Sequence, residues 1–101
     1  PPCRAEFPAL QAVADRYEQT GLVVFGVDVQ DAEVDAIAFL KEQGTTFPTG
    51  PDRNSQVAID YSVINFPTTF FITNDGRIFK KWVGQIDEVT LTTFIEELLV
   101  L

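Results

Sequence analysis

The residue types best suited to chemistry stand together at the start of the chain, where the run Pro1-Pro2-Cys3 is followed by Arg4. This run reads as the second half of a Cys-Pro-Pro-Cys redox motif that opens a helix, and the first cysteine would then lie one residue before Pro1. In such a motif the upstream cysteine is the exposed nucleophile, and the downstream cysteine, here Cys3, resolves the mixed disulfide. The alternative at this point is a lone cysteine beside a proline-rich helix start.

The composition of the chain excludes several classes of catalytic site, metal site and partner. The 101 residues include one cysteine and no histidine, which excludes an internal disulfide, Cys/His catalytic pairs and histidine zinc sites. The net charge of −8 argues against nucleic acid or an anionic membrane surface as a partner, because both require clustered Lys and Arg. Thiol or protein substrates remain open, and the sequence shows no ligand set for a metal, haem or other cofactor.

The first half of the chain must position Cys3. Its length, with 46% hydrophobic and 22% charged residues, predicts one globular domain over residues 1–101. Apolar residues at helical spacing predict a helix over residues 4–20 that Gly21 ends, with a kink or a shifted start near Pro8. The continuous apolar run 22–29 is typical of a buried parallel strand with helices on both faces.

The rest of the chain predicts five further features. Asp31 caps a helix over residues 32–43, in which Ile37 is one of the buried positions, and Phe47 could anchor a short edge strand within the irregular segment 45–53. The remaining elements are a short helix over 54–60, a hairpin of strands 68–73 and 77–83 around Asn74-Asp75-Gly76, and a last helix that Asp87 caps and that buries a stripe from Leu91 to Leu99.

The order of these elements and two local motifs resemble the TlpA/ResA/CcmG group of thioredoxin-like proteins. Pro2, Cys3, Arg4, Glu6 and Pro8 stand in register with the family motif Trp-Cys-x-Pro-Cys-(Arg/Lys)-x-Glu-x-Pro. The run Phe66-Pro67-Thr68-Thr69-Phe70-Phe71-Ile72, followed by Asp75-Gly76-Arg77, matches the family signature Pro-Thr-Thr-Phe-(Leu/Phe)-Ile and Asp-Gly-(Arg/Lys). The resemblance covers the whole chain. It implies an α/β thioredoxin-like fold, a mixed sheet with flanking helices, whose first strand, Trp and first Cys precede Pro1.

The resemblance also implies the site residues. Cys3 and Asp31 would be catalytic, Asp31 being the acidic residue near the end of the strand 22–29, although it could equally serve as an N-cap. Pro2 and the three residues Phe66, Pro67 and Thr68 would bind substrate.

Pro67 has the central role in that substrate site. We expect the Phe66–Pro67 bond to be cis and within contact distance of Cys3, so that a substrate peptide can add β-type hydrogen bonds beside it. Glu6 is interpreted as a solvated charge that the helix macrodipole favours.

By this resemblance, the intact protein is a thiol-disulfide oxidoreductase that is extracytoplasmic and anchored to a membrane by a segment before Pro1. Its partners would be protein thiols and disulfides, in some members those of apocytochrome c before haem attachment, and an upstream redox donor. The alternative is a redox-silent peptide-binding module, with a residue other than cysteine before Pro1. A peroxiredoxin is disfavoured because Cys3 lacks the Pro-x-x-x-Thr/Ser-x-x-Cys context.

Two expectations concern residues 1–101 taken alone. They should have no dithiol-disulfide exchange activity, because a single resolving thiol cannot close a disulfide internally. The strands 22–29 and 68–73 should not pair directly with each other, because the strand that leads into the motif would lie between them. Without that strand, the chain should not fold as a stable monomer.

Overall fold

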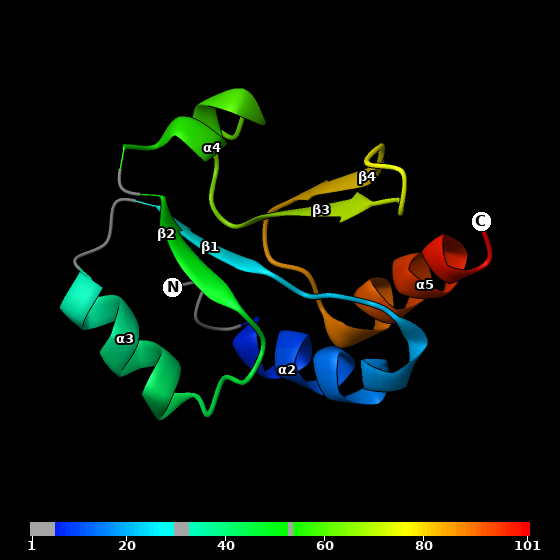
Figure 1. Cartoon of the computed structure of the whole chain (residues 1–101), viewed down its shortest axis with the longest axis horizontal. Coiled ribbons are helices and arrows are strands. Elements are labelled where there is room, and N and C mark those ends of the chain that lie inside the picture. The colour runs from blue at the N-terminus through cyan, green and yellow to red at the C-terminus, as the bar shows by residue number, and fades with distance from the viewer. Residues whose placement is uncertain (1–5, 30–32, 53) are drawn as a thin grey trace. The chain divides into compact units, whose positions relative to one another are not determined.

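The computed structural model describes residues 6–29, 33–52 and 54–101, and the chain divides into two compact units (Figure 1). Unit 1 comprises Pro1–Leu22 and Asn65–Leu101, and unit 2 comprises Val23–Ile64. The elements of unit 1 are α2 (Phe7–Arg16), the 3-10 turn η1 (Glu18–Thr20), β3 (Thr68–Ile72), β4 (Ile78–Val83) and α5 (Glu88–Leu99). Those of unit 2 are β1 (Gly26–Val29), α3 (Glu33–Glu42), β2 (Thr49–Asp52) and α4 (Gln56–Asp60).

Helix α2 begins at Phe7, so Pro8 lies in its first turn, where a missing backbone N–H breaks no helical hydrogen bond. The shifted start expected near Pro8 is therefore confirmed. The helix ends at Arg16, and the shorter turn η1 carries the chain to Gly21, the predicted end of the helical segment.

The hairpin of unit 1 is confirmed, but its turn differs from the expected one. Strands β3 and β4 pair antiparallel, starting with Thr68 opposite Val83. In the turn the N–H of Gly76 donates to the carbonyl of Thr73 at 3.0 Å, and only Gly76 of the Asn-Asp-Gly run has a positive φ, of +87°. The connection is thus a type I turn followed by a left-handed glycine, rather than a turn with successive positive φ angles.

The core of unit 1 lies between α2, α5 and the hairpin. Helix α5 begins where predicted, because the Asp87 carboxylate accepts the N–H of Thr90 at 2.8 Å. Leu91 and Ile95 on this helix are each 3% exposed. The buried residues that form the core cluster are Val13, Tyr17, Phe71, Ile86, Leu91 and Ile95.

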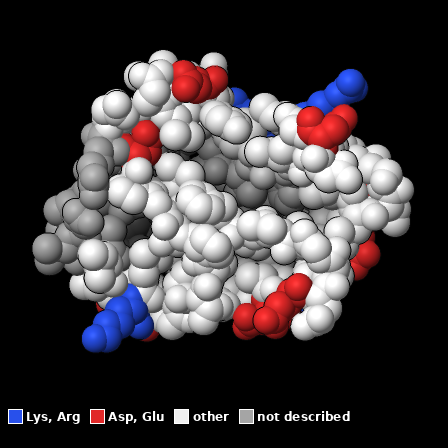
Figure 2. Space-filling view, viewed as in Figure 1, with Lys and Arg blue, Asp and Glu red and all other residues white. Residues whose placement is uncertain are grey.

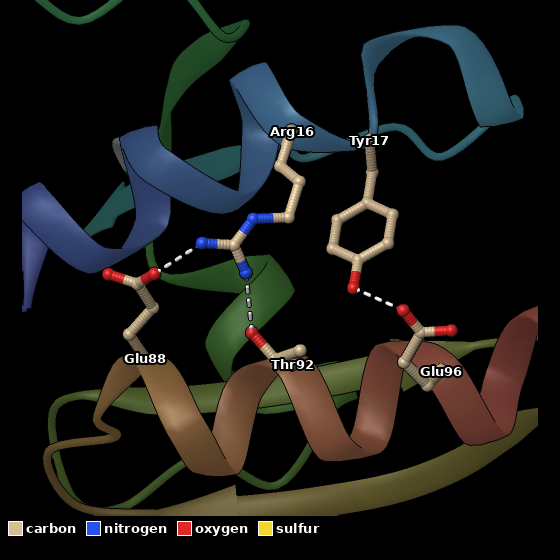
Figure 3. A network of polar contacts seen from close by, with 5 residues as sticks. All are labelled: Arg16, Tyr17, Glu88, Thr92 and Glu96. Carbon is tan, nitrogen blue, oxygen red and sulfur yellow. Dashed lines mark hydrogen bonds and ion pairs between the residues drawn. The ribbon is translucent and has the colours of Figure 1, made fainter.

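Polar side chains also join α2 to α5 at the surface (Figure 3). Arg16 donates to Glu88 at 2.6 Å and to Thr92 at 3.2 Å, and the hydroxyl of Tyr17 donates to Glu96 at 2.6 Å. The ion pair between Arg16 and Glu88 is about half exposed, so water screens it and it adds little to stability. Apolar burial, rather than this network, holds the two helices together.

In unit 2 the predicted strand is shorter and less buried than expected. Only Gly26–Val29 is strand, paired in parallel with β2 from Gly26 opposite Thr49, and Val23 and Phe25 are 75% and 60% exposed. Ile37 on α3, also expected to be buried, is 58% exposed. The reason is that β1 has one strand neighbour within the described ranges, so the apolar residues before it have no paired strand beside them.

The start of α4 depends on a residue that the sequence did not single out. Asp52, at the end of β2, is 4% exposed, and its carboxylate accepts the N–H groups of Val57 at 3.1 Å and Ala58 at 3.0 Å. These two bonds satisfy donors that the first turn of a helix leaves unpaired. Phe47, the expected anchor of the edge strand, is 8% exposed.

The described strands form two separate two-stranded sheets, β1 with β2 and β3 with β4. Each sheet lies within one unit, and the expected gap between the first apolar strand and the strand after Pro67 stays a prediction. No helix in the ranges that the structure describes is both long enough and apolar enough to cross a lipid bilayer.

Candidate functional site

The structure describes some of the predicted site residues and not others. Pro2, Cys3 and Asp31 lie outside the described ranges, so their roles stay predictions. Phe66 and Pro67 precede β3 in unit 1, and Thr68 is its first residue. The substrate-binding half of the proposed site can therefore be built from its contacts, whereas the thiol half can be placed only by its position in the sequence.

The Phe66–Pro67 peptide bond is cis, as predicted. Pro67 is buried, whereas the Phe66 side chain before it is 53% exposed. The hydroxyl of Thr68 donates to the carbonyl of Asn65 at 2.6 Å, which closes a short loop around the proline. The loop therefore combines a fixed backbone with one exposed aromatic ring. Its contact with Cys3 remains a prediction.

The carbonyl of Pro67 is held from the other side by the segment between β4 and α5. Here the N–H of Gly84 donates to that carbonyl at 2.9 Å. Gly84 has a φ of +99°, and a side chain there would meet no atom within 4 Å. Backbone conformation, rather than lack of space, therefore favours glycine at this position.

We call residues 84–86 the connector. The indole N–H of Trp82 donates to the carbonyl of Gln85 at 3.1 Å, so the last strand of the hairpin fixes the middle of the connector. Ile86, at its end, is 1% exposed and packs in the core of unit 1. The backbone N–H of Ile86 donates to Oε2 of Glu6 at 3.2 Å.

Glu6 corrects the sequence interpretation, which placed it as a solvated charge. It is 5% exposed and lies at the N-cap position of α2, but its carboxylate bonds to Ile86 instead of capping its own helix. Burial raises the pKa of Glu6 above its ordinary value of 4.5, and the bond from Ile86 offsets part of that increase. A buried carboxyl group that can be held neutral or charged thus lies three residues after Cys3 in the sequence.

One signal in the sequence could have found this carboxylate. Glu6 precedes Leu10, Val13 and Tyr17 by four, seven and eleven residues, which is the spacing of one helix face. Val13 and Tyr17 are buried and Leu10 packs against the core. The helix macrodipole depends on the position of Glu6 along the helix, whereas its burial depends on the face on which it lies.

Comparison with known proteins fits this arrangement. A family model described as the AhpC/TSA family matches residues 1–81. A DsbE homolog of Paracoccus denitrificans (strain Pd 1222), named as a thiol:disulfide interchange protein, is 40% identical over 100 residues, 97% of this chain and 53% of the relative. The thiol-disulfide oxidoreductase ResA of Bacillus cereus (strain ZK / E33L) is 26% identical over 97 residues, 96% of this chain and 56% of the relative.

A solved structure from Chlorobium tepidum, described as a DsbE-type thiol:disulfide interchange protein, gives a TM-score of 0.90 at 29% identity. It covers 97% of this chain and 71% of its own. The expected thioredoxin-like fold is thereby confirmed. The chain spans about half the length of the curated relatives that it matches.

Proposed function

We propose, from the premise that the chain belongs to the AhpC/TSA family, that it works in thiol-disulfide exchange with protein partners. The observation that carries this proposal is the similarity to the Paracoccus denitrificans protein, 40% over 97% of the chain. The family match runs from residue 1 to residue 81, so it includes Cys3, Glu6 and the loop at Pro67. The relatives reported above are named for disulfide exchange and not for peroxide reduction.

In the proposed reaction a cysteine before Pro1 attacks a substrate disulfide as its thiolate. One S–S bond breaks, a mixed disulfide forms and one substrate thiolate leaves. Cys3 then attacks the mixed disulfide, closes a disulfide with the upstream cysteine and releases the second substrate thiolate. Two electrons pass from the protein dithiol to the substrate, and a donor dithiol restores the reduced protein.

The residues of this chain have separate parts in that scheme. Cys3 resolves the mixed disulfide, and Asp31 relays a proton to or from the thiol pair. The positive end of the helix favours the thiolate form of the attacking cysteine. Pro2, Phe66, Pro67 and Thr68 receive the substrate segment. The exposed ring of Phe66 is suited to cover an apolar side chain next to a partner's cysteine.

The partners and the location follow as further parts of the proposal. The intact protein, a single domain with its strand and first cysteine before Pro1, would act outside the cytoplasm while anchored to a membrane. Its substrates would be disulfides of protein partners, apocytochrome c among them, and an upstream redox donor would supply electrons. The rival function is peptide binding without redox chemistry, which requires a residue other than cysteine before Pro1.

Insulin reduction by three forms of the protein tests the function. The natural protein with its sequence before Pro1 should turn over, its Cys3→Ser variant should stop at the mixed disulfide, and residues 1–101 alone should be inactive. Equal activity in the first and third forms would contradict the Cys-Pro-Pro-Cys scheme. Binding of a cysteine peptide without turnover in the first form would favour the rival function. In the same assay, Asp31→Asn should change the pH dependence of thiol reactivity.

A further inference from the structure

Strand β4 has an open edge and carries an excess of positive charge. It pairs with β3, and no other strand within the described ranges pairs with it (Figure 1). Of the charged residues between positions 68 and 83, one is acidic, Asp75, and three are basic: Arg77, Lys80 and Lys81. Three positive charges and one negative give this segment a net charge of +2 in a chain of −8. Asp75 pairs with Arg77 at 3.4 Å, so the excess charge belongs to the two lysines.

The two lysines of β4 lie over aromatic rings and have no acidic partner in the part of the chain that the structure describes. The Nζ atom of Lys80 lies 5.0 Å from the centroid of the Phe94 ring, and that of Lys81 lies 5.7 Å from the centroid of the Phe70 ring. These contacts keep both ammonium groups close to the hairpin. Successive residues of a strand point to opposite faces, so each face of the hairpin presents one unpaired positive charge.

The open edge of β4 is suited to an added strand. Such an edge presents unpaired backbone N–H and C=O groups, to which an extended segment can bond. The side chains of that segment would lie beside those of β4 on the same two faces. Ile78 and Val83, at the two ends of β4, are 55% and 54% exposed. The complement of this edge is therefore a segment with two adjacent acidic residues and an apolar residue two positions outside each of them.

A second copy of the chain fits this edge poorly. Two β4 strands related by a two-fold axis run antiparallel, and full overlap of residues 78–83 would place Lys80 of each copy opposite Lys81 of the other. Like charges directly opposite each other destabilise strand pairing. The two lysines therefore disfavour pairing of identical chains and favour an acidic partner.

We propose that the open edge of β4 is a docking surface for an extended acidic segment of a partner protein. The segment adds to the hairpin as a third strand and places two adjacent carboxylates beside Lys80 and Lys81. This proposal goes beyond the proposed function and does not depend on thiol chemistry. The alternative is that the lysines serve only to keep the edge unpaired, in which case an acidic segment does not bind.

Two capped hexapeptides test the proposal on the protein with its natural N-terminal sequence. The acidic probe is Val-Thr-Glu-Glu-Thr-Val, whose symmetric order suits either strand direction, and the basic probe has Lys-Lys in place of Glu-Glu. NMR of the backbone amides during titration gives the affinity and the location of binding, and amide hydrogen exchange reports the added strand. The variant is Lys81→Glu, at an exposed position. Its matched control is Lys41→Glu, at an exposed lysine in the last turn of α3.

We expect the acidic probe to shift the amide signals of residues 78–83 and, at saturation, to slow hydrogen exchange at alternate amides of β4 by about tenfold. The basic probe should bind the parent about tenfold more weakly. Lys81→Glu should reverse this preference between the probes. Lys41→Glu should change neither affinity by more than about twofold, because its charge is far from the edge in sequence and is screened by salt.

Four results would overturn the proposal. They are an absence of shifts at residues 78–83, equal affinities for the two probes, equal weakening by Lys81→Glu and Lys41→Glu, and exchange at β4 that slows as the concentration of the protein alone increases. The last would mean that a second copy occupies the edge. If Lys81→Glu does not fold, Lys81→Gln takes its place and should weaken binding of the acidic probe by about threefold.

Discussion

The two units of the molecule bury their apolar residues to very different extents. Unit 1 contains the whole core cluster, with Val13, Ile86 and Ile95 at 3% exposure or less. Among the unit 2 side chains whose burial the structure describes, by contrast, Phe47 and Ala58 are the buried apolar ones, while Val23 and Phe25 are mostly exposed. Unit 1 thus carries its own core, whereas unit 2 leaves large apolar side chains exposed.

Uncharged residues predominate over acidic and basic ones on the face drawn in Figure 2. Exposed large apolar residues of unit 2 include Val23, Phe25, Val27, Ile37, Val57, Ile59 and Ile64. Scattered exposed apolar residues are ordinary, but alternate positions before and within β1 are typical of a strand face that another element covers.

The largest expected difference between the units is in the free energy of unfolding that is lost when a single isoleucine is truncated. Ile95→Ala in unit 1 removes a side chain that is 3% exposed and should lower the free energy of unfolding by about 2–5 kcal/mol. Ile37→Ala in unit 2, where the side chain is 58% exposed, should lower it by less than about 0.5 kcal/mol. Urea unfolding of the protein with its natural N-terminal sequence measures both. A large loss at Ile37 would mean that this side chain is buried in the protein, which would contradict the contrast between the units.

The next effect concerns the buried polar residue of unit 2. Asp52→Ala removes the acceptor of two N–H groups in α4 and should lower the free energy of unfolding by about 1–3 kcal/mol. Amide exchange at Val57 and Ala58 should accelerate more than exchange in unit 1. The control is Asp60→Ala, since Asp60 accepts a bond from the exposed side chain of Gln56. Equal effects of the two substitutions would contradict the role of Asp52.

A smaller effect is expected in the pH dependence of stability, to which two carboxylates of unit 1 contribute in opposite directions. The pKa of Glu6 is raised above 4.5 by burial, so its contribution to stability is present below pH 4.5 and is lost as the pH rises through the raised pKa. The pKa of Asp87 is lowered below 3.8 by its bond from Thr90, so its contribution is present above pH 3.8 and is lost as the pH falls.

Glu6→Gln and Asp87→Asn should therefore change the pH dependence of unfolding in opposite directions. In Glu6→Gln the decrease in stability above pH 4.5 should become shallower, and in Asp87→Asn the decrease toward acid pH should become shallower. Urea midpoints measured from pH 3 to pH 8 test this, with Glu18→Gln as a control. Parallel curves for Glu6→Gln and its parent would mean that Glu6 titrates normally in the folded protein.

The smallest effect is expected for the surface network between α2 and α5 (Figure 3). Arg16 and Glu88 are 49% and 45% exposed, so a double-mutant cycle with Arg16→Leu and Glu88→Gln should give a coupling energy near the experimental error, smaller still in high salt. A coupling that persists in salt would show that the pair is shielded from water and that unit 1 depends on more than its apolar core.

The sequence predicted best what local spacing determines. The hairpin, the Asp87 cap and the start of α2 near Pro8 depend on residues within a few positions of one another, and the cis bond before Pro67 followed from a contiguous motif. These features were confirmed because turn and cap chemistry acts over short stretches of chain.

The features that could not be predicted from the sequence depend on partners elsewhere in the chain. Glu6 is buried because Ile86, 80 positions away, supplies its hydrogen bond. Asp52 accepts two bonds from a helix that begins four residues later, and a lone aspartate in an irregular segment gave no indication of this. The extent of β1 is set by where β2 pairs with it, which hydrophobic runs do not reveal.

The position of the single tryptophan has an optical consequence. The indole of Trp82 donates to the carbonyl of Gln85 in the connector, and its ring lies 5.8 Å from that of Phe94. Tryptophan emission depends on the polarity around the indole, and this chain contains no second tryptophan to obscure it. The intrinsic fluorescence of the protein is therefore a label-free signal from the connector, and rapid mixing with a disulfide substrate could follow that segment in real time.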